Sequence, residues 1–264
     1  MNKVILLIPH YNNVHGLQNS LRSIHKDEKV DVMIVDDGSN QKIDENKIRE
    51  VFVADGEVFF EYLKRNKGIE HALNKGLKCI QKMNYPYIAR LDCGDICQFK
   101  RFNIQELFLE KNNNIALVGS DVDFIDLKGK HVYTLKLPYK DRIIKKKMYL
   151  SAMHIHPTIM FRSIILDKIG LYPTKYKAVE DYAFFFNIIK HYKVANIDKV
   201  LVKCEINDTG ISSVLRNKQA RNRIKVILDN FYFGFYPIYG LLRGILLYIL
   251  PLKFLIKLKK IIKN

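Results

Sequence analysis

The stretch YIARLDCGD, residues 87–95, joins a short apolar run to two aspartates. Asp92 and Asp95 stand three positions apart where the apolar run ends, with Cys93 and Gly94 between them. These carboxylates can cap a following helix, which is the structural interpretation, or they can hold a cation, which is the functional one. Other parts of the sequence distinguish between these two interpretations.

Apolar runs of strand length recur along the first 120 residues. They predict strands at 4–8, 32–35, 58–63, 87–91 and 115–119. Between them, apolar residues recur at helical spacing around 17–24 and along 69–80. Alternating strands and helices predict an α/β fold, with a mostly parallel sheet that helices cover on both faces.

Polar clusters follow the first, second and fourth of these strands, at 10–13, 36–39 and 92–95. Ligands of such sheets bind beyond the carboxyl ends of the strands, so we expect these clusters to meet at one edge. Further along, residues 122–138 predict a hairpin that turns at 128–130. A basic helix at 142–150, a strand at 157–161 and a helix at 180–192 are predicted next.

Size and composition limit the alternatives. The 264 residues are 48% hydrophobic, which is enough for one large α/β domain and an appendage. The four cysteines, at 79, 93, 97 and 204, lack zinc-site spacing and are expected to be free thiols of a cytosolic protein. The apolar run at 4–8 is too short for a signal peptide.

The loop after the first strand, PHYNN (9–13), excludes two common nucleotide sites. It contains neither the G-x-G-x-x-G of dinucleotide-binding proteins nor a P-loop. Tyr11 offers instead an aromatic face on which a base could stack. Asp36 and Asp37 fit a turn, or they can accept hydrogen bonds from a base N–H or a ribose hydroxyl.

Six motifs in order resemble those of the family 2 glycosyltransferases with a GT-A fold. They are IPHYNN (8–13), VDDGS (35–39), NKGIEHALNKGL (66–77), ARLDCGD (89–95), HPTIMFR (156–162) and GLYPTKYKAVEDYAFFFNI (170–188). The resemblance covers residues 3–215 and implies a GT-A catalytic domain at 1–215, followed by a tail at 216–264. It also implies a sugar donor activated by a nucleoside diphosphate.

The resemblance assigns donor-binding roles to residues of four loops. They are Pro9, Tyr11, Asp36, Asp37, Arg65, Asn66, Lys67 and Asp92. It further implies that Asp92 and Asp95 hold Mn²⁺ or Mg²⁺ beneath the donor diphosphate, which suits the preference of these ions for oxygen ligands. One departure is that Gly94 stands where the family usually has the acid that binds the metal directly.

Glu180 and Asp181 also have two interpretations. Acids are favoured at a helix N-terminus for electrostatic reasons alone. The resemblance implies that Asp181 is the general base that deprotonates the acceptor hydroxyl, with Glu180 orienting it or contacting the acceptor. One carboxylate opposite the leaving group implies a single displacement with inversion. His156 and residues 205–213 are further candidates near the donor or acceptor.

The tail concentrates the positive charge. Residues 216–264 contain eleven Lys and Arg and one acid, so they carry +10 of the formal net charge of +17. Residues 231–264 are apolar and aromatic and then basic, but charges and Pro251 interrupt them before the ~20 residues that a spanning helix needs. We expect a basic amphipathic helical tail on an anionic membrane surface. An alternative is packing on the catalytic domain or on a second copy in a homodimer.

The sequence therefore predicts an inverting glycosyltransferase on the cytoplasmic face of a bacterial membrane. Its acceptor would be a growing glycan or a lipid-linked saccharide of capsule, lipopolysaccharide or O-antigen synthesis. Alternatives are a nucleotidyltransferase, a homologue that binds donor without turnover, and a basic nucleic-acid-binding protein. The last is disfavoured because the basic residues lie within continuous aliphatic sequence, and we expect no nucleic-acid partner.

Overall fold

The structure is a computed structural model that describes residues 2–206 and 215–250. Its centre is a nine-stranded sheet in the order β3-β2-β1-β4-β8-β6-β9-β5, with β7 paired to β6. The strands are β1 (Val4–His10), β2 (Asp31–Asp36), β3 (Val58–Tyr62), β4 (Tyr87–Arg90), β5 (Ile96–Cys97), β6 (Ile115–Ile125), β7 (His131–Leu135), β8 (Met160–Arg162) and β9 (Lys193–Glu205).

Strands β3, β2, β1 and β4 are parallel to one another. Strand β8 is antiparallel to both β4 and β6, so β4 and β6 run in the same direction on either side of it. Strands β6 and β9 are again parallel, and β5 and β7 pair antiparallel at the far side. The expectation of a mostly parallel sheet is confirmed for the half that carries the first three polar loops.

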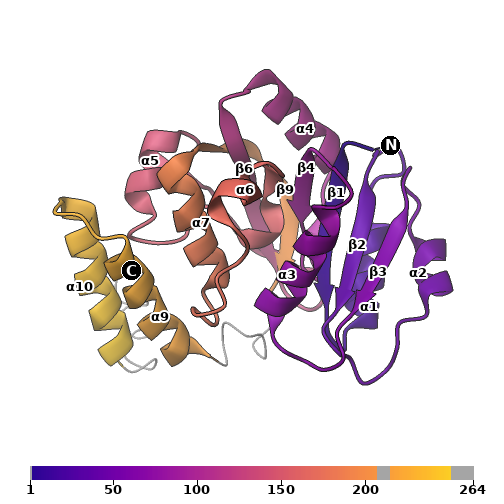
Figure 1. The fold of residues 1–264 in the computed structure, drawn as a ribbon, viewed down its shortest axis with the longest axis horizontal. Helices are drawn as coiled ribbons and strands as arrows, with labels where there is room; N and C mark the ends of the chain where they lie inside the picture. The colour runs from indigo at the N-terminus through magenta and orange to yellow at the C-terminus, as the bar shows by residue number, and fades with distance from the viewer. Residues whose placement is uncertain (1, 207–214, 251–264) are drawn as a thin grey trace.

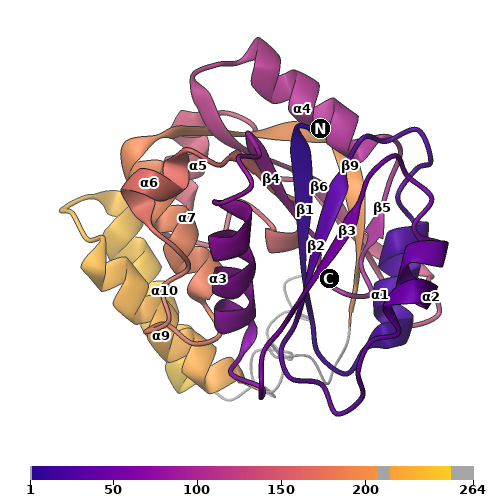
Figure 2. The ribbon, with the colours of Figure 1, turned by 45° about the vertical axis from the view of Figure 1, so that its right-hand side comes forward.

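Helices cover both faces of the sheet, as Figures 1 and 2 show. They are α1 (Val14–Arg22), α2 (Glu45–Val51), α3 (Ile69–Ile80), α4 (Arg101–Lys111), α5 (Asp141–Lys147), α6 (Ile165–Ile169), α7 (Glu180–His191), α9 (Arg216–Asp229) and α10 (Phe235–Ile249), and the one-turn 3₁₀ helix η1 spans His156–Thr158.

Alternation along the buried strands divides the core in two. In β1, Ile5 and Leu7 face the cluster with α3 and α7, whereas Leu6 and Ile8 face the cluster with α1. Because both faces are covered, β1 and β2 are apolar along nearly their whole length, which is the pattern of strands buried on two sides. This packing places the carboxyl ends of β1, β2 and β4 at one edge.

Most predicted elements are confirmed, one differs, and several were not predicted, namely α2, β5, α4, α6 and β9. The expected strand at 157–161 is divided into η1 and the short β8, because Pro157 starts a 3₁₀ turn and has no N–H for a ladder. The long strand β9 was missed, since its register shifts at several points against β6 and its polar residues break the alternation.

Helices α9 and α10 lie on the α7 side of the molecule, with α9 between α7 and α10 (Figure 1). Val226 and Ile227 of α9 belong to the same apolar cluster as α7. Within residues 2–206 and 215–250, no helix is sufficiently long and apolar to cross a bilayer. The candidate loop at 207–213 and the lysines at 253–263 lie outside the described residues.

Candidate active site

The loops after β1 and β2 are joined at the carboxyl edge by a buried pair. His10 Nδ1 lies 2.7 Å from Asp36 Oδ2, and the other oxygen of Asp36 accepts from the backbone N of Ser39 at 2.8 Å. Burial alone would raise the pKa of Asp36, but these hydrogen bonds outweigh it and hold the pKa below its usual value. The ionised carboxylate of Asp36 therefore holds the β2 loop in place. The sequence did not predict that His10 would be its partner.

Asp37 joins the β2 loop to the loop that precedes α3. Its Oδ1 accepts from the backbone N of Lys67 and its Oδ2 from that of Gly68, each at 2.9 Å. Burial raises the pKa of Asp37 in spite of these bonds. Gly38, at φ +72°, packs so closely that a Cβ there would lie 2.4 Å from the carbonyl carbon of Arg65. The predicted donor residues of the two loops thus come together.

Tyr11 and Pro9 lie on the β1 side of this junction. Tyr11 is 46% exposed, so its side chain is accessible for the stacking on a base that the sequence predicts. Pro9 is buried in β1, where it pairs with Val35, and its carbonyl accepts from Cys93 Sγ. Arg65 and Asn66 are exposed beside Lys67 on the loop before α3. The roles of these residues in donor binding stay a prediction.

The loop after β4 presents Asp92 to solvent and buries Asp95. Asp92 pairs with the guanidinium of Arg90, and its side chain is 38% exposed. Asp95 is buried, and its Oδ1 accepts from the backbone N of Glu205 at 3.0 Å. Burial and the charge of Asp92 raise the pKa of Asp95 to about 8. A nearby positive charge would therefore stabilise the ionised form of Asp95.

Gly94 leaves space at this edge. Its φ is +105°, and a Cβ built there would meet only Glu205 Oε2, at 4.0 Å. Ser20 of α1 holds the loop, since its hydroxyl accepts from Gly94 N at 3.0 Å and donates to the carbonyl of Asp95 at 2.8 Å. Glu205, at the end of β9, therefore brings a carboxylate toward the position of the missing acid. Sequence spacing gave no sign of this approach.

The donor set at this edge fits a divalent cation that is shared with a substrate. Mg²⁺ and related ions are held by one or two carboxylates, with substrate phosphates as further ligands. Asp92 and Asp95 would supply two carboxylates of this kind. In the described part of the chain, no three His, Cys, Asp or Glu side chains gather around one point. A diphosphate would have to complete the coordination.

Glu180 and Asp181 begin α7, as predicted, and both are in the same charged region. Burial and the charge of Asp181 raise the pKa of Glu180 to about 8. Burial also raises the pKa of Asp181, and Asp92 is near enough to raise it further. Arg223 of α9 and Arg90 act in the opposite direction. The charges of Asp92 and Arg90 therefore act on Asp181, although 86 positions separate Asp95 from Asp181 in the sequence.

A buried polar network that the sequence did not predict supports this edge. Arg90 is buried and contacts His156 Nδ1 at 3.5 Å, and His156 Nε2 lies 2.8 Å from the hydroxyl of Tyr172. Burial, and then the charge of Arg90, lowers the pKa of His156 well below its usual value, so this imidazole is neutral. Tyr172 also exchanges two hydrogen bonds with Asn74 of α3. His156 is therefore a structural member of the site.

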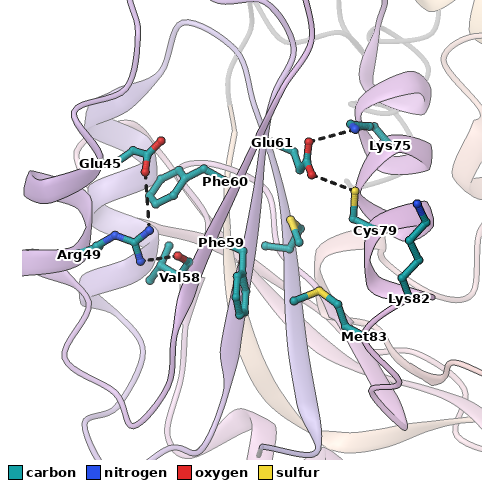
Figure 3. A pocket seen from close by; sticks show the side chains of 11 residues that line it. Glu45, Arg49, Val58, Phe59, Phe60, Glu61, Lys75, Cys79, Lys82 and Met83 are labelled. Carbon is teal, nitrogen blue, oxygen red and sulfur yellow. Dashed lines mark hydrogen bonds and ion pairs between the residues drawn. The ribbon is translucent and has the colours of Figure 1, made fainter.

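A hollow beside the edge strand β3 lies between α2 and α3 and is separate from this edge (Figure 3). Four of its charged side chains pair with one another: Glu61 pairs with Lys75 at 3.0 Å and accepts from Cys79 Sγ at 3.2 Å. Arg49 pairs with Glu45 and donates to the carbonyl of Val58. These contacts join β3 to its neighbouring helices.

Comparison with known structures defines the class of the fold. Residues 1–349 of Staphylococcus aureus TarS, in complex with UDP-GlcNAc, match with a TM-score of 0.68 and 17% identity over 93% of this chain and 72% of that one. A mannosyltransferase of Pyrobaculum calidifontis, in complex with GDP-Man and Mn²⁺, matches with a TM-score of 0.63 and 14% identity over 92% of this chain and 68% of that one. The fold is that of the GT-A glycosyltransferases.

Sequence comparison then gives the family. The sequence model described as Glycosyl transferase family 2 matches residues 5–170. An uncharacterized glycosyltransferase of Methanocaldococcus jannaschii is 33% identical over 208 residues, which are 76% of this chain and 70% of that protein. A bifunctional glycosyltransferase of Dictyostelium discoideum is 25% identical over 71% of this chain and 29% of that protein. The chain belongs to glycosyltransferase family 2.

Proposed function

We propose that the protein transfers a sugar from a nucleoside-diphosphate sugar, UDP-linked by default, to a hydroxyl of a growing glycan or lipid-linked saccharide. The observation that carries the proposal is a series of contacts that joins the β4 loop to α7, the helix that begins with Glu180 and Asp181. Arg90 pairs with Asp92 and contacts His156, His156 contacts the hydroxyl of Tyr172, and the Tyr172 ring stacks on Phe184 of α7. Asp181 would face the acceptor while Asp92 faces the departing diphosphate. The complexes of TarS with UDP-GlcNAc and of the mannosyltransferase with GDP-Man support a donor of this type.

The residues divide the chemistry between them. Asp181 would take the proton of the acceptor hydroxyl as its oxygen attacks the anomeric carbon, and Glu180 would orient the acceptor. The bond to the diphosphate breaks in the same step, which inverts the anomeric configuration. Asp92 and Asp95 would hold Mn²⁺ or Mg²⁺, which supplies positive charge to the leaving diphosphate when bound. The buried guanidinium of Arg90 pairs with Asp92 and keeps its carboxylate in place.

A donor panel with an activity control tests this function. Release of UDP or GDP is measured from UDP-glucose, UDP-galactose, UDP-N-acetylglucosamine and GDP-mannose, with glycan acceptors present. We expect release from one donor, and Asp181→Asn should abolish turnover while donor binding remains, because the base is lost and the donor loops are intact. Donor binding without turnover in the unmodified protein would favour the degenerate homologue that Gly94 suggests.

We also propose that the protein acts at the cytoplasmic face of an anionic membrane, in the synthesis of a bacterial surface polysaccharide. The support is the outer face of α10, where apolar side chains at helical spacing are exposed. These side chains are Phe235, Ile238, Tyr239, Leu242, Ile245, Leu246 and Ile249. The opposite face packs inward, with Gly240 against the backbone of Tyr149. Exposed bases on α9, Lys218, Arg221 and Lys225, add charge attraction to anionic lipid.

Sedimentation with vesicles tests the membrane proposal. We expect binding to vesicles that contain phosphatidylglycerol and weaker binding to pure phosphatidylcholine. The pair Leu242→Glu and Leu246→Glu should lose binding, because both side chains lie on the exposed stripe. Leu127→Glu is the control, since Leu127 is exposed on the distant hairpin turn. The proposal would be overturned if the unmodified protein did not bind vesicles but formed a dimer that Leu242→Glu abolishes. The exposed face of α10 would then be a homodimer interface.

A further inference from the structure

Glu70, in the first turn of α3, has a carboxylate oxygen without a hydrogen-bond partner. The residue is 4% exposed, and among the described residues nothing donates to its Oε1. A buried carboxylate without donors is costly, so such groups in folded proteins are usually completed by a ligand or water. None of the motifs in the sequence pointed to Glu70.

The other oxygen places Glu70 beside the donor loops. Glu70 Oε2 lies 2.7 Å from the position that a Cβ on Gly68 would take. The backbone N of Gly68 in turn donates to Asp37, and the charge of Glu70 contributes to the raised pKa of Asp37. Glu70 therefore adjoins the junction that is proposed to hold the nucleotide.

Glu180, the first residue of α7, also has a carboxylate oxygen without a hydrogen-bond partner among the described residues. The residue is 6% exposed, and this oxygen is its Oε2. Glu70 lies one helical turn before Asn74, and Glu180 one turn before Phe184. Asn74 bonds to the backbone of Tyr172, and Phe184 stacks on the Tyr172 ring with centroids 4.1 Å apart. Glu70 and Glu180 thus each lie one turn before a residue that contacts Tyr172.

The two helices begin on the same side of the molecule. In Figure 1, α3 and α7 both start at the lower edge, toward which β1 and β2 also run. The charge of Glu70 contributes to the raised pKa of Glu180. Both belong to helix N-termini, which favour negative charge.

A third buried polar atom without a partner among the described residues is Nε of Arg90, and it bears on the kind of ligand. The charge of Arg90 also acts on Glu180. A cation would suit the two carboxylates but not the guanidinium. The hydroxyls of a sugar ring suit all three, because each hydroxyl both donates and accepts hydrogen bonds.

We infer that Glu70 Oε1 accepts a hydrogen bond from a ring hydroxyl of the donor sugar, opposite Glu180, and so contributes to sugar selection. The inference rests on the proposed function, because it assumes a nucleoside-diphosphate sugar at this edge. Glu70 is the carboxylate on the nucleotide side of the sugar and Glu180 is the one on the acceptor side. A site that binds a hydroxyl through a buried acceptor rejects sugars that lack this hydroxyl.

Calorimetry with UDP alone and with the four sugars of the panel tests the inference. In Glu70→Ala, we expect the affinity for the selected nucleotide sugar to fall about tenfold or more relative to the affinity for UDP. Glu70→Gln, which keeps a neutral acceptor, should lose less, since bonds to charged acceptors are about twice as strong. Glu45→Ala, which removes an acid from the first turn of α2, should leave the ratio unchanged.

Three other results would overturn the inference. Unchanged affinities for both UDP and the nucleotide sugar in folded Glu70→Ala would show that the sugar does not contact Glu70. An equal fall for UDP and the nucleotide sugar would show that Glu70 only supports the loops. If Glu70→Ala does not fold, an unchanged ratio in Glu70→Gln serves the same purpose. Absence of binding of any UDP or GDP compound to the unmodified protein would reject the proposed function itself.

Discussion

The side-chain amide of Asn74 exchanges two hydrogen bonds with the backbone of Tyr172, 98 positions further along the chain. Asn74 Nδ2 donates to the Tyr172 carbonyl at 2.9 Å, and the Tyr172 N–H donates to Asn74 Oδ1 at 2.8 Å. Tyr172 also bonds to His156 and stacks on Phe184. This contact joins the helix that follows the donor loops to the segment that leads into Glu180 and Asp181.

Asn74→Ala should lower both stability and activity. Loss of the amide leaves the N–H and carbonyl of Tyr172 without partners, at a cost of about 1–3 kcal/mol in unfolding free energy. Turnover should fall more than UDP affinity, since the acceptor side loses its position relative to the donor side. Asn19→Ala is the control, because the Asn19 side chain bonds to His15 of its own helix and to no other side chain among the described residues. Equal stability of the two variants in urea unfolding would contradict this account.

Gly38→Ala should separate the β2 loop from the loop that precedes α3. The added Cβ would lie 2.4 Å from the backbone of Arg65, and the φ of +72° is also unfavourable. Gly129 is a matched control, because its φ is +77° and nothing lies within 4 Å of an added Cβ. Gly129→Ala should cost about 1–2 kcal/mol from the backbone alone. Gly38→Ala should cost more and weaken UDP binding; equal costs would mean that the close approach is unimportant.

The fold was largely predictable because the first strands are buried on both faces. Their runs of Val, Ile and Leu and the helical spacing at 69–80 report this burial directly. The loop residues were predictable as a group, since the carboxyl ends of parallel strands share an edge. The pairing of Asp36 with His10 and of Asp37 with the backbone was not, because it depends on loop conformation.

Residues that act across the sheet could not be found by spacing. Arg90 looks like an ordinary strand residue, yet it lies buried beneath Asp92. Glu70 follows Ile69 at the start of a helix, where an acid is expected for the helix dipole alone. Glu205 approaches Gly94 only because β9 pairs with β5 and β6. The approach of Glu205 to Gly94 depends on long-range strand pairing, and the burial of Arg90 and Glu70 depends on tertiary packing, which local patterns do not encode.

The stability of the free protein should decrease between pH 6.5 and 8. Burial raises the pKa values of Asp95 and Glu180 to about 8, so the folded state keeps protons that the unfolded chain releases above its ordinary carboxyl pKa. Their burial therefore costs more stability as the pH rises toward 8. Below pH 6.5, the buried neutral His154 and His156 oppose this trend, since their pKa values are lowered.

Urea unfolding at pH 6.5, 7.25 and 8 measures this decrease. The expected loss is on the order of 1–2 kcal/mol for each carboxyl over this range. Glu180→Gln should show a smaller decrease because it removes one of the two titrating groups. A free energy of unfolding that is constant or rises with pH in the unmodified protein would contradict the assignment of these groups as buried acids.

The acidic limb of the activity profile should depend on Arg223. Burial raises the pKa of Asp181, whereas the charge of Arg223 lowers it. A general base must be ionised, so kcat/KM should fall as the pH drops through this pKa. Arg223→Gln should move the limb toward higher pH. Arg221→Gln, on the exposed side of the same helix, should leave it unchanged; a shift in both variants would indicate only a general charge effect.

The most direct test of the account is UDP binding measured by calorimetry with and without Mn²⁺. In the unmodified protein, we expect Mn²⁺ to strengthen UDP binding at least about tenfold, as a shared cation should. Asp92→Asn should lose this gain, and Asp55→Asn, at an exposed position, should keep it. Failure of UDP and GDP to bind, with or without Mn²⁺, would contradict the claim that this edge of the sheet holds a nucleotide-sugar donor.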